Sequence, residues 1–197
     1  MPPAKPADAP RAPRAAPQPA NLAKESAMDF TELAAQRYSV RKYAERPVEA
    51  EKIQAVLEAG RLAPTAKNLQ PQRIHVLQSP EALAKVREVV QCAFNAPVVL
   101  VCCGDVTRGW VNPFSHFNHT ETDVAIVTCH MMLKATELGL GTLWVGLFDP
   151  QKITDTFELP EQEIPFALLL LGYAAEDATP APAHSARKPL SETVSWL

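Results

Sequence analysis

Glycine is scarce in this chain, at only 7 of 197 residues, which leaves little for the Gly-rich loops that cradle phosphates. The chain is too short for a dinucleotide-binding domain followed by a separate substrate domain. No apolar run approaches the roughly 18 residues of a transmembrane helix, and the N-terminus lacks the apolar core of a secretory signal. The net charge is −3, so we expect neither a nucleic-acid binder nor a membrane-surface binder.

Cysteine pairs and catalytic nucleophiles are also missing. None of the four cysteines forms a C-x-x-C pair, and we expect reduced thiols in a cytoplasmic protein. Cys102 and Cys103 lie in an apolar run, where burial raises a thiol pKa and leaves the thiol inert. No G-x-S-x-G elbow occurs. Four residues resemble a metal set by type, but their spacing does not favour a metal site: His116, His119, Cys129 and His130.

Residues 1–27 differ from the rest of the chain. They hold seven of the 19 prolines and nine alanines, with almost no large apolar side chain. Such a segment cannot bury enough surface to offset its ordering entropy, so we expect a disordered tail. An organelle transit peptide is the alternative, although the prolines disfavour its amphipathic helix. The remainder, residues 28–197, reads as one globular domain.

Helical and extended patterns alternate after Met28. Helical spacing is seen from Ile53 to Gly60, where Pro64 ends the helix, and again from Leu83 to Phe94. A further short helix is expected after Pro150. Apolar strands are expected over four ranges: 74–77, 98–103, 142–147 and 166–171. This alternation favours a layered domain of helices and strands.

One helix, from about Asp123 to Leu138, is apolar on nearly all sides and should be the central buried helix. Thr120 and Asp123 have the spacing of a capping box at its start. Gly139 ends it.

The first motif with chemical meaning is the segment RYSVRKY at residues 37–43. In an extended segment, Arg37, Ser39 and Arg41 share one side. Two guanidiniums flanking a hydroxyl form a clamp for a dianionic phosphate. The alternative is a solvated basic turn.

The second motif, APTAKNLQPQR at residues 63–73, joins a helix to a strand between two prolines that stiffen it. Its side chains at Thr65, Asn68 and Gln70 both donate and accept, which suits sugar hydroxyls and the edge of a heterocycle. The alternative is an ordinary polar loop.

Two weaker motifs follow. In GLGTLWVG, residues 139–146, a helix enters and a strand leaves, which is the reverse of a dinucleotide fingerprint. Gly146, close to Trp144, could let a flat ligand approach the backbone. The segment SARKPL at residues 185–190 adds a basic pair, which alone indicates a solvated charge pair. Groups that bind phosphates and ring edges thus outnumber acids, bases and nucleophiles, which indicates that a cofactor performs the chemistry.

Together these segments resemble the FMN-dependent nitroreductase family, in its compact single-domain branch. The matching pieces are RYSVRKY, APTAKNLQPQRIHV, HMMLKATELGLGTLWVGLFDP and ARKPL, in that order. Tyr38 stands where many relatives carry a second basic residue, and Gln72 where many carry Trp.

The resemblance implies an α+β fold: a three-layer α-β-α sandwich around a mainly antiparallel sheet, in an intertwined homodimer with two FMN sites at the subunit interface. It implies a cofactor-binding set and no covalent catalytic residue or metal. By position, Arg37, Ser39, Arg41 and Arg187 hold the phosphate and ribityl chain; Asn68 and Gln70 meet the ribityl chain or ring edge; and Trp144, Val145 and Gly146 line the isoalloxazine. Tyr38 and Thr65 complete the cofactor-binding set. Arg73 is a further candidate for the flavin N1/O2 edge.

The implied activity is that of an oxidoreductase using NADH or NADPH. Hydride would pass through flavin N5 to a nitroaromatic, a quinone or free flavin in a ping-pong cycle. A flavin-binding sensor or interaction protein without turnover is the alternative. A hydrolase or metal enzyme built on His116, His119 and Cys102 is a third possibility.

Overall fold

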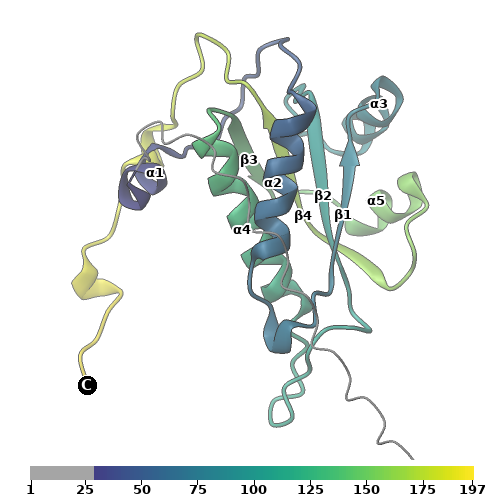
Figure 1. Cartoon of the computed structure of the whole chain (residues 1–197), viewed down its shortest axis with the longest axis vertical. Coiled ribbons are helices and arrows are strands. Elements are labelled where there is room, and N and C mark those ends of the chain that lie inside the picture. Colours follow the sequence, from purple (N-terminus) through teal and green to yellow (C-terminus); the bar gives the residue numbers. More distant parts are fainter. Residues whose placement is uncertain (1–28) are drawn as a thin grey trace, which may run out of the picture.

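The computed structural model describes residues 29–197, so the predicted N-terminal tail lies outside the described residues. A four-stranded sheet is flanked by helices on both faces (Figure 1). The elements are α1 (Phe30–Gln36), α2 (Ala50–Leu62), β1 (Gln72–Leu77), α3 (Pro80–Val89), β2 (Val98–Asp105), α4 (Thr120–Glu137), β3 (Gly141–Val145), α5 (Pro150–Phe157) and β4 (Glu163–Gly172).

The sheet has the strand order β1-β2-β4-β3, and every neighbouring pair is antiparallel. The central strands β2 and β4 carry the longest apolar runs, because both of their faces are covered. A register shift between Cys102 and Cys103 marks a bulge in β2. The predicted antiparallel α+β sheet is therefore confirmed.

Successive side chains of β2 point to opposite faces of the sheet and so belong to different halves of the core. Val98, Leu100 and Cys102 pack with α2 and α4 on one face of the sheet. Val99, Val101 and Cys103 pack with α3 and α5 on the other face. This confirms the predicted three-layer α-β-α arrangement.

The helix α4 is the central helix on its face, as predicted, and packs most extensively against α2. It begins at Thr120, so the predicted capping box is wrong. His119 occupies the N-cap, and Asn118 Oδ1 accepts from the Thr120 backbone N–H at 3.0 Å. Asp123 turns its carboxylate away, to a loop that is distant in sequence.

The helix α3 ends at Val89, five residues before the predicted Phe94. Val90 is its C-cap, in an extended conformation, and the chain then turns through left-handed residues at Phe94 (φ 45°) and Asn95 (φ 52°) into β2. Val90 still packs into the core, so its place in the apolar spacing reflects its burial and does not show that the helix continues.

Both cysteines of β2 are fully buried, and burial raises the pKa of Cys102 and of Cys103 to about 12. This confirms that both are core cysteines, and their raised pKa values favour unreactive thiols. Over residues 29–197, no helix combines the length and the apolar character that crossing a membrane requires.

Candidate functional site

The segment after α1 is extended and anchored to the edge of the sheet. Arg37 is the C-cap of α1 with ψ 122°, and Ser39 forms a parallel bridge with Thr142 at the start of β3. The Val40 backbone N–H donates to the Thr142 carbonyl at 2.9 Å. The buried Val40 side chain fits only because residue 141 is glycine: a Cβ there would lie 2.5 Å from Val40 Cγ2.

This anchoring turns the alternate side chains of the segment into one pocket of about 250 Å³, which we call the arginine pocket. Its lining brings together four predicted residues with three others: Arg37, Ser39, Arg41, Ala181, Ala183, His184 and Arg187. Within residues 29–197, none of its three guanidiniums lies within 4.0 Å of a carboxylate.

The far wall of the arginine pocket is a short 3-10 turn, Pro182–His184, and the residues after it. Arg187 Nη1 donates to the carbonyls of His184 at 2.5 Å and Ala186 at 2.7 Å. Tyr38 does not line the pocket; its ring meets the His184 ring edge-on at a centroid distance of 6.2 Å. The sequence did not point to His184 or to the two alanines before it, Ala181 and Ala183. The nearby Pro182 and Arg187 were the available signals for an ordered, anion-facing turn.

The contents of the arginine pocket suit a phosphate group. Three guanidiniums without carboxylate partners offer directed donors and a charge that complements a dianion. The small volume suits a phosphate and part of a ribityl chain, since pockets that hold a complete drug-sized ligand measure roughly 300–1,000 Å³.

The second predicted motif forms a tight loop, residues 65–70, which we call the Asn68 loop. Three of its residues adopt left-handed conformations: Lys67 (φ 50°), Asn68 (φ 55°) and Gln70 (φ 51°). Thr65 Oγ1 accepts from the Gln70 backbone N–H at 3.1 Å, which closes the loop. Each left-handed non-glycine residue costs roughly 1–2 kcal/mol, so the surroundings must hold this shape. The amide side chains of Asn68 and Gln70 are exposed.

The third group lies on β3, which is an edge strand. Trp144 is 37 % exposed on the edge strand, whereas the Val145 side chain is buried in the core. A Cβ on Gly146 would meet no atom within 4 Å, so the backbone there is open to a planar group. Val145 can therefore offer only its backbone to a ligand.

One chain does not gather these three groups into a single cavity. The Asn68 loop is fixed to Asp123, in the first turn of α4, while Val40 and Thr142 place the arginine pocket beyond the last turn of α4. With a rise of 1.5 Å per residue, the 15 residues from Asp123 to Leu138 separate the two ends by about 22 Å. The two halves of the predicted site thus lie at opposite ends of one helix, as Figure 1 allows the reader to follow.

The remaining candidates have other surroundings. Arg73 pairs with Asp105 and Glu163, each at 3.8 Å, and donates to the Gln72 carbonyl at 2.8 Å. His119 stacks among aromatic rings. Within the described part of the chain, no three His, Cys, Asp or Glu side chains form a group that could hold a metal ion.

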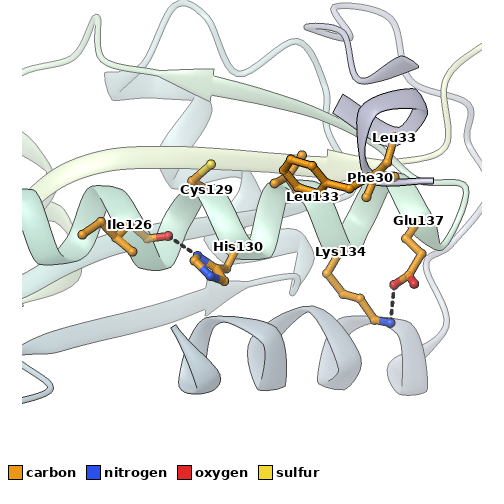
Figure 2. Close-up of a pocket in the computed structure, with 8 residues that line it drawn as sticks. All are labelled: Phe30, Leu33, Ile126, Cys129, His130, Leu133, Lys134 and Glu137. Atoms are coloured by element: carbon orange, nitrogen blue, oxygen red, sulfur yellow. Dashed lines mark hydrogen bonds and ion pairs between the residues drawn. The ribbon is translucent and has the colours of Figure 1, made fainter. Parts of the chain in front are cut away.

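A second hollow, of about 510 Å³, lies between α1 and the outward face of α4 (Figure 2). Phe30 and Leu33 from α1 face Leu133 of α4, and Cys129 and Ile126 continue the apolar surface. Phe30 is 68 % exposed. We call this surface the α1–α4 groove.

Comparison with known proteins gives the family. The family model described as "Nitroreductase family" matches residues 34–99 and 90–173. A relative from Methanothermobacter thermautotrophicus, provisionally named NADH dehydrogenase/NAD(P)H nitroreductase, is 33 % identical over 161 residues, covering 78 % of this chain and 82 % of the relative.

Solved structures agree with this match. A nitroreductase family protein from Clostridium difficile 630 is 44 % identical, with a TM-score of 0.81 over 86 % of this chain and 98 % of the other. A structure from Exiguobacterium sibiricum, provisionally named a nitroreductase and solved in complex with FMN, shares the fold. It is 22 % identical, with a TM-score of 0.75 over 89 % of this chain and all of the other. From its sequence, its fold and these matches, this chain belongs to the nitroreductase family.

Proposed function

We propose that this protein is an FMN-dependent NAD(P)H oxidoreductase that acts on small organic electron acceptors. The observation that carries the proposal is the arginine pocket: three guanidiniums without carboxylate partners and one hydroxyl, in a chain of the nitroreductase family. The name of the Methanothermobacter relative and the FMN in the Exiguobacterium structure support the same cofactors.

In this proposal the arginine pocket holds the FMN phosphate. Arg37, Arg41 and Arg187 donate charge-assisted hydrogen bonds, and Ser39 donates from its hydroxyl. Gly146, which leaves the backbone open, and the exposed Trp144 would line the ring system at the edge of β3. FMN, when bound, supplies acceptance of hydride from NADH or NADPH at N5 and its return to an acceptor in a second half-reaction. The acceptors that suit this chemistry are nitroaromatics, quinones and free flavins.

The Asn68 loop that each arginine pocket lacks is supplied, we propose, by a second copy of the chain. A twofold axis across the middle of α4 sets the first turn of one α4 beside the last turn of the other. The Asn68 loop of one protomer then meets the arginine pocket of its partner, which accounts for their separation within one chain. The α1–α4 groove supplies an apolar surface for this contact.

The C-terminal segment supports an intertwined pairing. It runs past α1 and away from the sheet (Figure 1), and its apolar side chains are exposed: Leu190, Val194, Trp196 and Leu197. Such side chains gain stability when a partner covers them. In this proposal the protomers exchange these segments.

In this proposal the protein's own groups bind and orient the cofactor and the reactants. Asn68 and Gln70 contact the ribityl chain or the ring edge with amides that both donate and accept. The reduced nicotinamide and the acceptor would bind in turn at the same place. A cytoplasmic location is consistent with the four free thiols of the described residues.

Anaerobic titration of the purified protein tests the proposal. We expect stoichiometric FMN, and loss of its absorbance near 450 nm on adding NADH or NADPH. An acceptor such as a benzoquinone should restore the absorbance. Bound FMN that neither nicotinamide reduces would contradict the enzyme and favour a flavin-binding sensor; absence of any FMN binding would contradict the cofactor assignment.

A further inference from the structure

We propose that Asp123 is the positioning residue that holds the Asn68 loop in its FMN-binding conformation, and that the fold retains this carboxylate at a cost to its own stability. The inference rests on the proposed function for the purpose of the loop. It rests on the structure alone for the contact and for the cost.

The contact is direct and joins two elements that are distant in sequence. The Ala66 backbone N–H donates to Asp123 Oδ1 at 2.9 Å, across 57 residues. Asp123 lies in the first turn of α4, and its own backbone N–H donates to the His119 carbonyl, so the carboxylate projects from a rigid element. It is only 2 % exposed.

The loop needs such an anchor because its other hydrogen bonds are mostly internal. Asn68 N donates to the Thr65 carbonyl at 2.9 Å, and Leu69 N to the Ala66 carbonyl at 3.1 Å. These bonds close turns but do not attach the loop to the body. The left-handed conformations of Lys67, Asn68 and Gln70 persist only where the surroundings over-determine them. Asp123 supplies that constraint at Ala66, next to the first of them.

The other carboxylate oxygen shows the cost. Within residues 29–197, Asp123 Oδ2 is buried without a hydrogen-bond partner. A buried carboxylate that is only partly satisfied destabilises a fold, and an apolar side chain of similar shape is often more stable in its place. Stability alone does not favour a partly satisfied buried carboxylate at this position. The need to shape a binding loop can favour one.

Two variants separate these roles. Asp123→Leu keeps the branched shape but removes the acceptor, and Asp123→Asn keeps an oxygen for the Ala66 N–H but removes the charge. Asp123→Ala replaces the Leu variant in the exchange and affinity comparisons if the larger side chain prevents folding. Ser79→Ala is the matched control, because Ser79 also accepts from a backbone N–H, that of Ala82 at 3.2 Å, at the start of α3 on the other face of the sheet.

The first readout needs no cofactor. Amide hydrogen exchange at Ala66 in the FMN-free protein should be at least tenfold faster in Asp123→Leu than in wild type, and within threefold of wild type in Asp123→Asn. Equal exchange rates in all three proteins would overturn the proposal, whether or not FMN binds.

The second readout is FMN affinity set against stability. We expect the Kd of Asp123→Leu for FMN to rise at least tenfold while its denaturant midpoint is unchanged or higher, and Asp123→Asn to restore the affinity. Ser79→Ala should show the opposite pattern: a lower midpoint and an unchanged Kd. Wild-type affinity in Asp123→Leu would overturn the proposal, as would a weakened Asp123→Asn. Wild-type protein that binds no FMN at all would instead refute the proposed function, and Ala66 exchange would still decide the role of Asp123.

Discussion

Replacing Arg37 with alanine should weaken FMN binding without weakening the fold. Arg37 is half-buried, whereas Arg41 and Arg187 are exposed, so water screens its contact with a phosphate least. Within the described residues its guanidinium makes no hydrogen bond or ion pair. Its loss therefore leaves no partner unsatisfied, and we expect the free energy of unfolding to change by less than about 0.5 kcal/mol.

The size of the affinity loss follows from the type of contact. A hydrogen bond to a charged group contributes roughly 1.5–3 kcal/mol, which corresponds to a rise in Kd of about 10- to 150-fold. Arg187→Ala should cost a similar amount, but it also loosens the turn that Arg187 holds through the His184 carbonyl. Arg37→Ala is therefore the cleaner variant of the two.

Quenching of flavin fluorescence on binding measures Kd directly, and thermal unfolding of the FMN-free protein measures stability. Arg87→Ala is the control, because Arg87 lies on α3, on the far face of the sheet, and the variant has the same net charge. The wild-type Kd should rise with ionic strength, and the Arg37→Ala Kd should rise less steeply. Wild-type affinity in the Arg37→Ala/Arg187→Ala double variant would refute the phosphate assignment of the arginine pocket.

Three further predictions concern the fold and the assembly. Hydrogen bonds from the Tyr173 hydroxyl, at 2.6 Å and with the largest effect, from the backbone and from Arg46 lower the pKa of Glu49 to about 2. These contacts therefore stabilise the fold above pH 4.5, the ordinary pKa of the group, and the stabilisation is lost as the pH falls toward 2. Tyr173→Phe should accordingly reduce the acid dependence of the unfolding free energy, and an unchanged pH profile would contradict this linkage. Cys102 and Cys103 should stay unmodified by a disulfide reagent at pH 8 until the protein unfolds, because burial raises both pKa values to about 12; rapid labelling in the native state, mapped by mass spectrometry, would be inconsistent with their burial. Leu133→Asp, in the α1–α4 groove, should yield folded monomers that bind FMN weakly, which light scattering and fluorescence can check, and an intact dimer would exclude this groove from the contact.

The sequence predicted the core better than the ends of its elements. The strand at 98–103 is recognisable because both faces of β2 are buried, which leaves an unbroken apolar run. The end of α3 was misplaced because Val90, its C-cap, and Phe94, in the turn that follows, continue the helical spacing of apolar residues. Val90 is buried in the core, but Phe94 is 37 % exposed, so the apolar spacing continues past the point where the helix and its core contact end.

Which candidate side chains lie together could also be predicted only in part. Arg37, Ser39 and Arg41 could be placed together because the alternation of an extended segment is a local property. Asp123 was mistaken for a capping residue, since its spacing from Thr120 fits that pattern and its contact with Ala66 spans 57 residues. The separation of the Asn68 loop from the arginine pocket is likewise a property of the packed chain.

In the proposed dimer two copies of the chain build each FMN site, one with its arginine pocket and the other with its Asn68 loop. Co-expression of two differently tagged variants, Arg37→Ala/Arg187→Ala and Asn68→Gly/Gln70→Gly, tests it most directly. Glycine is chosen in the loop because both positions have positive φ. Each variant alone should bind FMN weakly. In the purified hybrid dimer about half of the sites should regain wild-type affinity, because one site combines both intact halves and the other both altered halves. Hybrid dimers that bind FMN no better than either parent would contradict the shared site.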